Sequence, residues 1–136
     1  MNGREIKLAI FDDVPSMRDT VRLWLEDDND IHSVAEAGTR EDALAIVPRL
    51  GEMGVSAVTL DGNFSKDDYS GNDGREVLAA IRKMYGDQIV VAAISAGDFT
   101  QKGEYRADVF FNKDNYRRGN EVPLRIRQLV ESRGKG

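Results

Sequence analysis

Polar side chains stand at the ends of four short apolar runs in this sequence. The runs are residues 6–11, 55–60, 89–94 and 109–111. The polar residues that follow them are, in the same order, Asp12 with Asp13, then Asp61, Ser95 and Lys113. Carboxylates, a hydroxyl and an ammonium are groups that bind a metal ion and a phosphoryl group, so these five residues form a candidate site.

The residue types define the chemistry that such a site can carry out. Three carboxylates that meet at one point repel each other, and a bound cation relieves that repulsion. Because all the ligands are oxygens, they favour a hard ion such as Mg²⁺ over zinc or copper. Ser95 and Lys113 are suited to donate hydrogen bonds to the oxygens of a phosphoryl group. A site of this kind can transfer a phosphoryl group onto a carboxylate, which gives an aspartyl phosphate.

The apolar runs themselves predict the elements that position these side chains. They are continuous and not alternating, which is typical of parallel strands that are buried on both faces. The expected strands are residues 6–11, 31–37, 55–60, 88–95 and 107–112. Helical spacing of apolar residues predicts helices over residues 15–25, 39–50, 74–85 and 122–133, with a weaker one over 97–106. This alternation indicates an α/β fold with a doubly wound, five-stranded parallel sheet flanked by helices on both faces. Ligands of such sheets bind at the carboxyl ends of the strands, where the candidate residues stand.

Most charged residues of these helices are expected to face solvent. In the first helix they are Arg18, Asp19, Arg22 and Glu26, opposite an apolar face of Met17, Val21, Trp24 and Leu25. Basic residues also gather near the end of the chain, at Arg117, Arg118, Arg125, Arg127, Arg133 and Lys135. They are interleaved with apolar residues, so we interpret them as the solvated face of an amphipathic helix.

Length, composition and charge narrow the class of protein. A chain of 136 residues is most simply one domain. Its net charge of −5 argues against direct nucleic-acid binding, which requires clustered Lys and Arg. No apolar segment reaches the roughly 20 residues of a membrane-spanning helix, and the N-terminus lacks the apolar centre of a secretory signal. With no cysteine in the sequence, a cytoplasmic location is expected.

The order and setting of the candidate residues resemble those of a known family. The matching features are Phe11-Asp12-Asp13 after the first strand, Asp61 after the third, Ser95 after Val90–Ile94, and Lys113 after Val109–Asn112. Together they resemble the receiver domain of two-component response regulators, over a core of about residues 5–133 of a single domain spanning 1–136. The resemblance implies a flavodoxin-like (CheY-like) topology.

The resemblance also implies a role for each residue of the site. Asp61 would be the phosphoacceptor, Asp13 a direct Mg²⁺ ligand, and Asp12 a ligand that acts mainly through water. The backbone carbonyl of Asn63 would supply a further metal ligand. Ser95 and Lys113 would each bind a phosphoryl oxygen, with Ser95 relocating on phosphorylation. Phe110 would be the switch aromatic, whose rotamer couples phosphorylation to the surface formed by the last strand and its neighbouring helices.

A receiver of this kind takes its phosphoryl group from a phosphohistidine. The implied partners are a sensor histidine kinase or a histidine phosphotransfer protein, and a downstream protein target. The sequence contains no output domain after the last helix, so we expect a stand-alone receiver that signals by protein contact or onward phosphotransfer, unless the sequence is a fragment of a longer protein. Such a protein catalyses its own phosphorylation and dephosphorylation but is not classified as an enzyme.

Two other interpretations remain open at this stage. A degenerate receiver would bind partners without being phosphorylated; Asp114, which stands where the family usually has proline, and the long loop over residues 62–73 favour it. An aspartyl-phosphate hydrolase resembling the haloacid dehalogenase family would use an Asp after the first strand as nucleophile. That family's Asp-x-Asp motif is incomplete here, because Val14 occupies its second acidic position.

Overall fold

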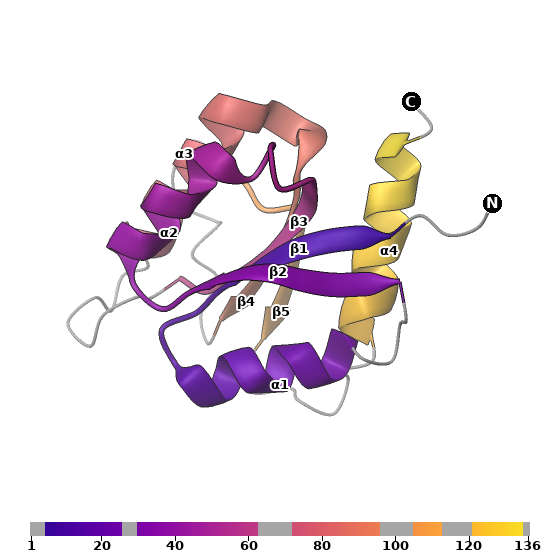
Figure 1. Ribbon diagram of the computed structural model, residues 1–136, viewed down its shortest axis with the longest axis horizontal. Helices are drawn as coiled ribbons and strands as arrows, with labels where there is room; N and C mark the ends of the chain where they lie inside the picture. Colours follow the sequence, from indigo (N-terminus) through magenta and orange to yellow (C-terminus); the bar gives the residue numbers. More distant parts are fainter. Residues whose placement is uncertain (1–4, 26–29, 63–71, 96–104, 113–120, 135–136) are drawn as a thin grey trace.

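A computed structural model describes residues 5–25, 30–62, 72–95, 105–112 and 121–134 (Figure 1). Its five strands are β1 (Ile6–Phe11), β2 (Ile31–Ala37), β3 (Val55–Leu60), β4 (Val90–Ser95) and β5 (Val109–Asn112). All neighbouring strands are parallel, in the order β2-β1-β3-β4-β5. The predicted doubly wound sheet is therefore confirmed, and strand order reverses on either side of β1, where the chain moves first to β2 and then back across to β3.

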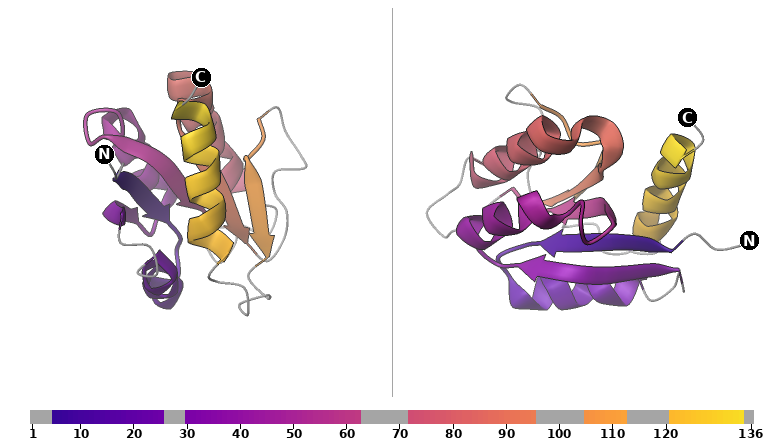
Figure 2. Two further views of the ribbon diagram at one scale, coloured as in Figure 1. Left: turned by 90° about the vertical axis from the view of Figure 1, so that its right-hand side faces the viewer. Right: turned by 45° about the horizontal axis from the view of Figure 1, so that its top comes forward.

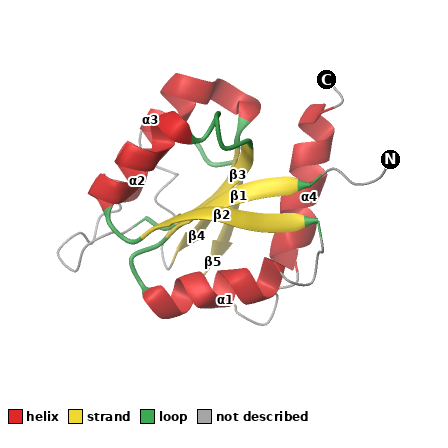
Figure 3. Ribbon diagram, in the orientation of Figure 1, coloured by secondary structure: helices red, strands yellow, loops and turns green. Residues whose placement is uncertain are grey.

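Helices cover both faces of this sheet (Figures 2 and 3). They are α1 (Pro15–Leu25), α2 (Arg40–Ile46), α3 (Asn72–Tyr85) and α4 (Glu121–Gly134). Helices α1 and α4 lie on one face and contact each other, whereas α2 and α3 lie together on the other. The helix expected over residues 97–106 falls mainly outside the described residues. None of the described helices is both long enough and apolar enough to span a membrane.

Two apolar clusters form the core, one on each face of the sheet. Strand residues alternate between them, as the pleat of a strand requires: in β1, Leu8 and Ile10 face α1 and α4, while Ala9 and Phe11 face α2 and α3. Trp24 of α1 is only partly buried, at the margin of its cluster. The central strands are buried on both faces, which explains why their sequences are continuous apolar runs.

The boundaries of α2 follow from its sequence. The side chain of Thr39 accepts a hydrogen bond from the backbone N–H of Asp42, 3.1 Å away, so Thr39 caps the helix. Pro48 cannot continue a regular α-helix, and the chain tightens there into a 3₁₀ turn over Val47–Arg49. The helix expected over residues 39–50 therefore ends at Ile46 and is followed by this 3₁₀ turn.

Three further boundaries differ by two residues from those expected. Helix α3 begins at Asn72, two residues earlier than predicted. Strand β4 begins at Val90 and not at residue 88, because Gly86, with φ of 61°, ends α3 and starts a 3₁₀ turn through Gln88. Strand β5 begins at Val109. The side chain of Asp108 accepts the hydrogen bond from the N–H of Val91, which in a longer strand would go to a backbone carbonyl.

Candidate functional site

Backbone hydrogen bonds keep β1 in register with β2 and β3 up to the acidic residues. The N–H of Asp61 donates to the carbonyl of Phe11 at 2.9 Å, and the N–H of Asp12 donates to the carbonyl of Ala37 at 3.0 Å. Phe11 also pairs with Leu60 in the register of β1 and β3. The ends of β1 and β3 are therefore fixed side by side, and the acidic residues that follow them meet at the carboxyl edge of the sheet.

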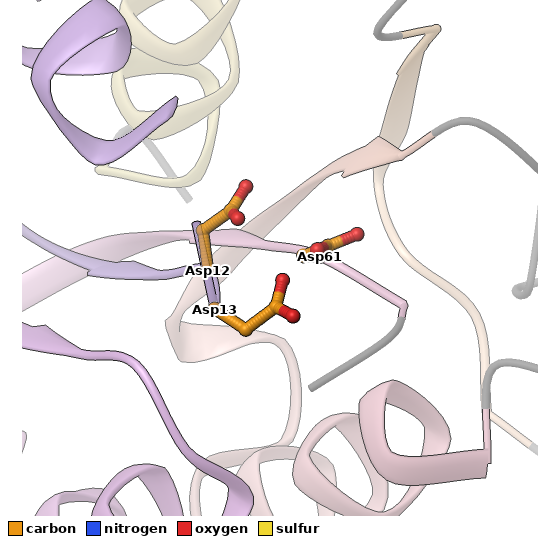
Figure 4. Close-up of side chains that lie close together, drawn as sticks. All are labelled: Asp12, Asp13 and Asp61. Carbon is orange, nitrogen blue, oxygen red and sulfur yellow. The ribbon is translucent and has the colours of Figure 1, made fainter. Parts of the chain in front are cut away.

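Asp12, Asp13 and Asp61 form one cluster at that edge (Figure 4). Each contributes a carboxylate oxygen, and these oxygens lie within 4.8 Å of one another. Asp12 and Asp61 are only 3% and 4% exposed, while Asp13 is half-buried. Three carboxylates crowded into so small and dry a space can bind a divalent cation, and a set of oxygen ligands fits a hard ion.

Local contacts hold Asp12 in place at the start of the cluster. Its carboxylate Oδ1 accepts a hydrogen bond from the backbone N–H of Val14 at 3.0 Å. Its backbone carbonyl accepts a second one from Nη1 of Arg18 at 2.7 Å. Two hydrogen bonds thus stabilise the turn from β1 into α1, one accepted by the side chain of Asp12 and one donated by Arg18 of α1.

A glycine brings the start of α3 close to Asp61. The N–H of Gly74 donates to the carbonyl of Gly62 at 2.9 Å. A Cβ atom at Gly74 would lie 2.6 Å from the Cα of Gly62 and 2.7 Å from the carbonyl oxygen of Asp61. Only glycine allows the helix to approach the backbone of the acidic site this closely.

The remaining predicted site residues divide into two groups. Ser95 is 2% exposed at the end of β4, and it pairs with Asn112 of β5. Phe110 is half-buried in β5 beside Ala93 and packs against the apolar cluster on the α2 and α3 face. Asn63 and Lys113 fall outside the described residues, as do Asp114 and most of the loop over residues 62–73. Their predicted roles stay predictions.

Sequence reasoning missed two residues that contact this site. Arg18 was expected to face solvent, but it is half-buried and reaches back to Asp12, because the turn after β1 is short enough to bring the first turn of α1 within reach. The role of Gly74 was also missed. The sequence did offer a signal: glycine in the first turn of a helix destabilises the helix, so its presence there indicates a close contact that excludes a side chain.

A second charged cluster lies at the opposite edge of the sheet, beside the start of β5. Asp108 accepts hydrogen bonds from the N–H of Val91 at 2.7 Å, from Arg82 at 2.9 Å and from Arg133. The expectation that Arg133 faces solvent was therefore wrong. Burial alone would raise the pKa of Asp108, but these hydrogen bonds outweigh it and hold that pKa below its usual range. The cluster ties the ends of α3 and α4 to β4 and β5.

The sequence matches no protein-family model and no curated protein. The fold does match solved structures over nearly the whole chain. The response regulator domain of Thermotoga maritima CheB is 20% identical with a TM-score of 0.71, covering 94% of this chain and 98% of that one. A response regulator from Thermotoga maritima is 17% identical with a TM-score of 0.70, covering 94% and 99%. The BeF3-activated DrrB receiver domain is 20% identical with a TM-score of 0.66, again covering 94% and 99%. At these identities the likeness concerns the fold.

Proposed function

We propose that this chain, which has the fold of response regulator receiver domains, is the phosphoacceptor receiver of a two-component or phosphorelay system. Its phosphoryl group would come from a phosphohistidine and be carried by Asp61. The observation that carries the proposal is the cluster of Asp12, Asp13 and Asp61, buried where β1 and β3 end, with oxygens within 4.8 Å of one another. The reversal of strand order at β1 is where such sheets bind their ligands.

The residues divide the work of phosphoryl transfer between them. A carboxylate oxygen of Asp61 attacks the phosphorus, a P–O bond forms, and the P–N bond to the donor histidine breaks. Asp12 and Asp13, with Asp61 and the backbone carbonyl of Asn63, would hold Mg²⁺. When bound, Mg²⁺ offsets the negative charge of the carboxylates and of the phosphoryl oxygens.

Ser95 and Lys113 complete the site in this proposal. The hydroxyl of Ser95 ends β4, the strand next to β3, and would donate to one phosphoryl oxygen. The ammonium of Lys113, which follows β5, would pair with another. The hydroxyl of Ser95 would thus supply a hydrogen-bond donor, and the ammonium of Lys113 a positive charge, next to the negative charge of the transferred phosphoryl group.

Phosphorylation would be reported through β5. Movement of Ser95 toward the phosphoryl group leaves space beside it, and Phe110 would respond by changing rotamer. Phe110 is suited to this because it is half-buried and already borders the apolar cluster. The changed surface would be recognised by a downstream protein, with a sensor histidine kinase or a histidine phosphotransfer protein as the donor.

The proposal treats residues 1–136 as one receiver domain with a core of about 5–133. It places the protein in the cytoplasm, where phosphohistidine donors are made from ATP. It includes no direct contact with nucleic acid or membrane.

Incubation with Mg²⁺ and acetyl phosphate, followed by intact mass, tests the proposal. The wild-type chain should gain one phosphoryl group, and chelation of Mg²⁺ should prevent the gain. Asp61→Asn should gain none. Asp87→Asn, which alters an exposed Asp outside the cluster, should behave as wild type.

Other outcomes would favour the alternatives. No adduct at any Mg²⁺ concentration, together with no binding of beryllofluoride, would indicate a degenerate receiver that acts only as a binding module. Steady hydrolysis of phosphate esters that requires Asp12 and survives Asp61→Asn would indicate a hydrolase resembling the haloacid dehalogenases.

A further inference from the structure

Arg18 links three parts of the structure that border the acidic site. From the first turns of α1, its Nη1 donates to the backbone carbonyl of Asp12 at 2.7 Å. Its Nε lies 3.4 Å from the carboxylate of Glu36, near the end of β2. The side chain is 21% exposed, so the guanidinium is largely sheltered from solvent. One side chain therefore connects the end of β1, the start of α1 and the end of β2.

The guanidinium of Arg18 packs against Gly38, which directly follows β2. A Cβ atom at Gly38 would lie 2.7 Å from Nη1 of Arg18 and 3.4 Å from its Cζ. The guanidinium thus occupies the space that any side chain at position 38 would take. Gly38 does not have a positive φ, so close approach by Arg18, and not backbone conformation, is what favours glycine there.

We propose that Arg18 is a positioning residue for the acidic site, and that the lack of a side chain at Gly38 leaves the space that its guanidinium needs. The inference rests on the proposed function, because it assigns Arg18 a role toward the Mg²⁺ that the three carboxylates would bind. Mutual repulsion tends to drive these carboxylates apart when no cation is bound. Arg18 opposes that by holding the backbone of Asp12.

Binding to the carbonyl is suited to this role. The contact fixes the turn that carries Asp12 and Asp13, and it is made to a backbone carbonyl and not to one of the carboxylate oxygens that would bind the cation. The ion pair with Glu36 in turn orients the guanidinium, so that it is already aligned before any metal arrives.

Arg22 offers a matched control on the same helix. Its Nε lies 3.1 Å from the other carboxylate oxygen of Glu36, and it also pairs with Asp19. Arg22→Ala removes the same charge and a partner of the same Glu36 without removing the hydrogen bond to Asp12. An effect of Arg18→Ala that Arg22→Ala lacks is therefore due to the contact with the acidic site.

The first measurement is the affinity for Mg²⁺ alone, by titration of ¹⁵N-labelled protein. Arg18→Ala should weaken Mg²⁺ binding about tenfold, the low end of the range for groups that support metal ligands. Arg22→Ala should leave it within about twofold, as expected for an exposed ion pair. Arg18→Lys should recover part of the affinity, since an ammonium can bind the carbonyl but cannot also match the geometry of Glu36.

Gly38→Ala tests the same contact without removing Arg18. The new methyl should displace the guanidinium and weaken Mg²⁺ binding several-fold, by less than Arg18→Ala. In the Arg18→Ala background it should have no further effect, because nothing is left to displace. Equal effects of Gly38→Ala in both backgrounds would contradict the inference.

A measurement without metal separates this inference from the proposed function. The N–H of Val14 donates to the carboxylate of Asp12, so its exchange with solvent reports the order of the turn. Arg18→Ala should speed exchange at Val14 but leave the N–H of Val21, in the middle of α1, unchanged. Wild-type exchange at Val14 in this variant would overturn the inference, as would wild-type Mg²⁺ affinity. If the wild-type chain binds no Mg²⁺ but Val14 responds to Arg18→Ala, the proposed function fails and the positioning role stands.

Discussion

The N–H of Gly74, in the first turn of α3, donates a hydrogen bond to the carbonyl of Gly62, immediately after Asp61. A Cβ atom at Gly74 would lie within 3.0 Å of three backbone atoms of Asp61 and Gly62. Backbone atoms cannot turn aside as the end of a long side chain can. The position of α3 is therefore coupled to the position of the acidic site.

Gly74→Ala should push α3 away from the end of β3. We expect a loss of about 1–3 kcal/mol in the free energy of unfolding, typical of forced overpacking, and a clear fall in phosphoryl uptake from acetyl phosphate. Gly51→Ala is the control, since the atoms nearest to its Cβ would belong to the side chain of Tyr85, the first of them at 3.3 Å. Equal phosphoryl uptake by the Gly74→Ala and wild-type chains would show that the site tolerates movement of α3.

Asp108 should be important for stability, because it joins Arg82, Arg133 and the backbone of β4 at the edge of the sheet away from the acidic site. The side chains of Asp108 and Arg82 are 12% and 8% exposed. Asp108→Ala leaves the buried guanidinium of Arg82 and the half-buried guanidinium of Arg133 without their carboxylate, and should cost about 3 kcal/mol in urea unfolding. Asp87→Asn, an exposed change nearby, should stay within about 0.5 kcal/mol of wild type.

The pKa of Asp108 also predicts an acid dependence of stability. Because this pKa is lower in the folded chain, the unfolded chain binds more protons as the pH falls below about 4. The contribution of Asp108 is thus complete above that pH and is lost as the pH drops toward the folded value. The difference in unfolding free energy between wild type and Asp108→Asn should shrink from pH 6 to about pH 3. A constant difference would contradict the assigned shift.

Tyr85 fastens the end of α3 to the turn after α2. Its hydroxyl donates to the carbonyl of Val47 at 2.6 Å and accepts from the N–H of Gly51 at 3.1 Å. Tyr85→Phe should cost about 1–2 kcal/mol in thermal or urea unfolding, since two hydrogen bonds are lost. Phosphoryl uptake should be unchanged, because these contacts lie away from the acidic cluster. Reduced phosphoryl uptake by a fully folded Tyr85→Phe chain would contradict this prediction, because it would show that the contacts of Tyr85 affect the acidic cluster.

The sheet and the acidic cluster could be predicted from the sequence because both depend on local patterns. Continuous apolar runs identify buried parallel strands, and the carboxyl ends of such strands share one edge. Asp12 and Asp61, 49 positions apart by number, were brought together by that rule alone. That both side chains are buried, and that their carboxylate oxygens lie within 4.8 Å of each other, could be learned only from the structure.

Contacts between charged side chains and distant partners could not be predicted in this way. Arg18 and Arg133 each lie on helices where a charged residue usually faces solvent, and helical spacing carries no information about what lies beyond the helix. Arg133 contacts Asp108 only because α4 packs against β3 and β4. The need for glycine at positions 38 and 74 could not be predicted either, since the atoms that approach these residues belong to other segments of the chain.

Phosphorylation of Asp61 can be tested at the residue itself by borohydride reduction. The chain is incubated with Mg²⁺ and acetyl phosphate, reduced with borohydride, digested and sequenced by mass spectrometry. Reduction converts an aspartyl phosphate to homoserine and so marks the residue that carried it. We expect homoserine at position 61, and only when Mg²⁺ is present. Homoserine at position 12 or 13, or at no position in a folded chain that binds Mg²⁺, would contradict this expectation.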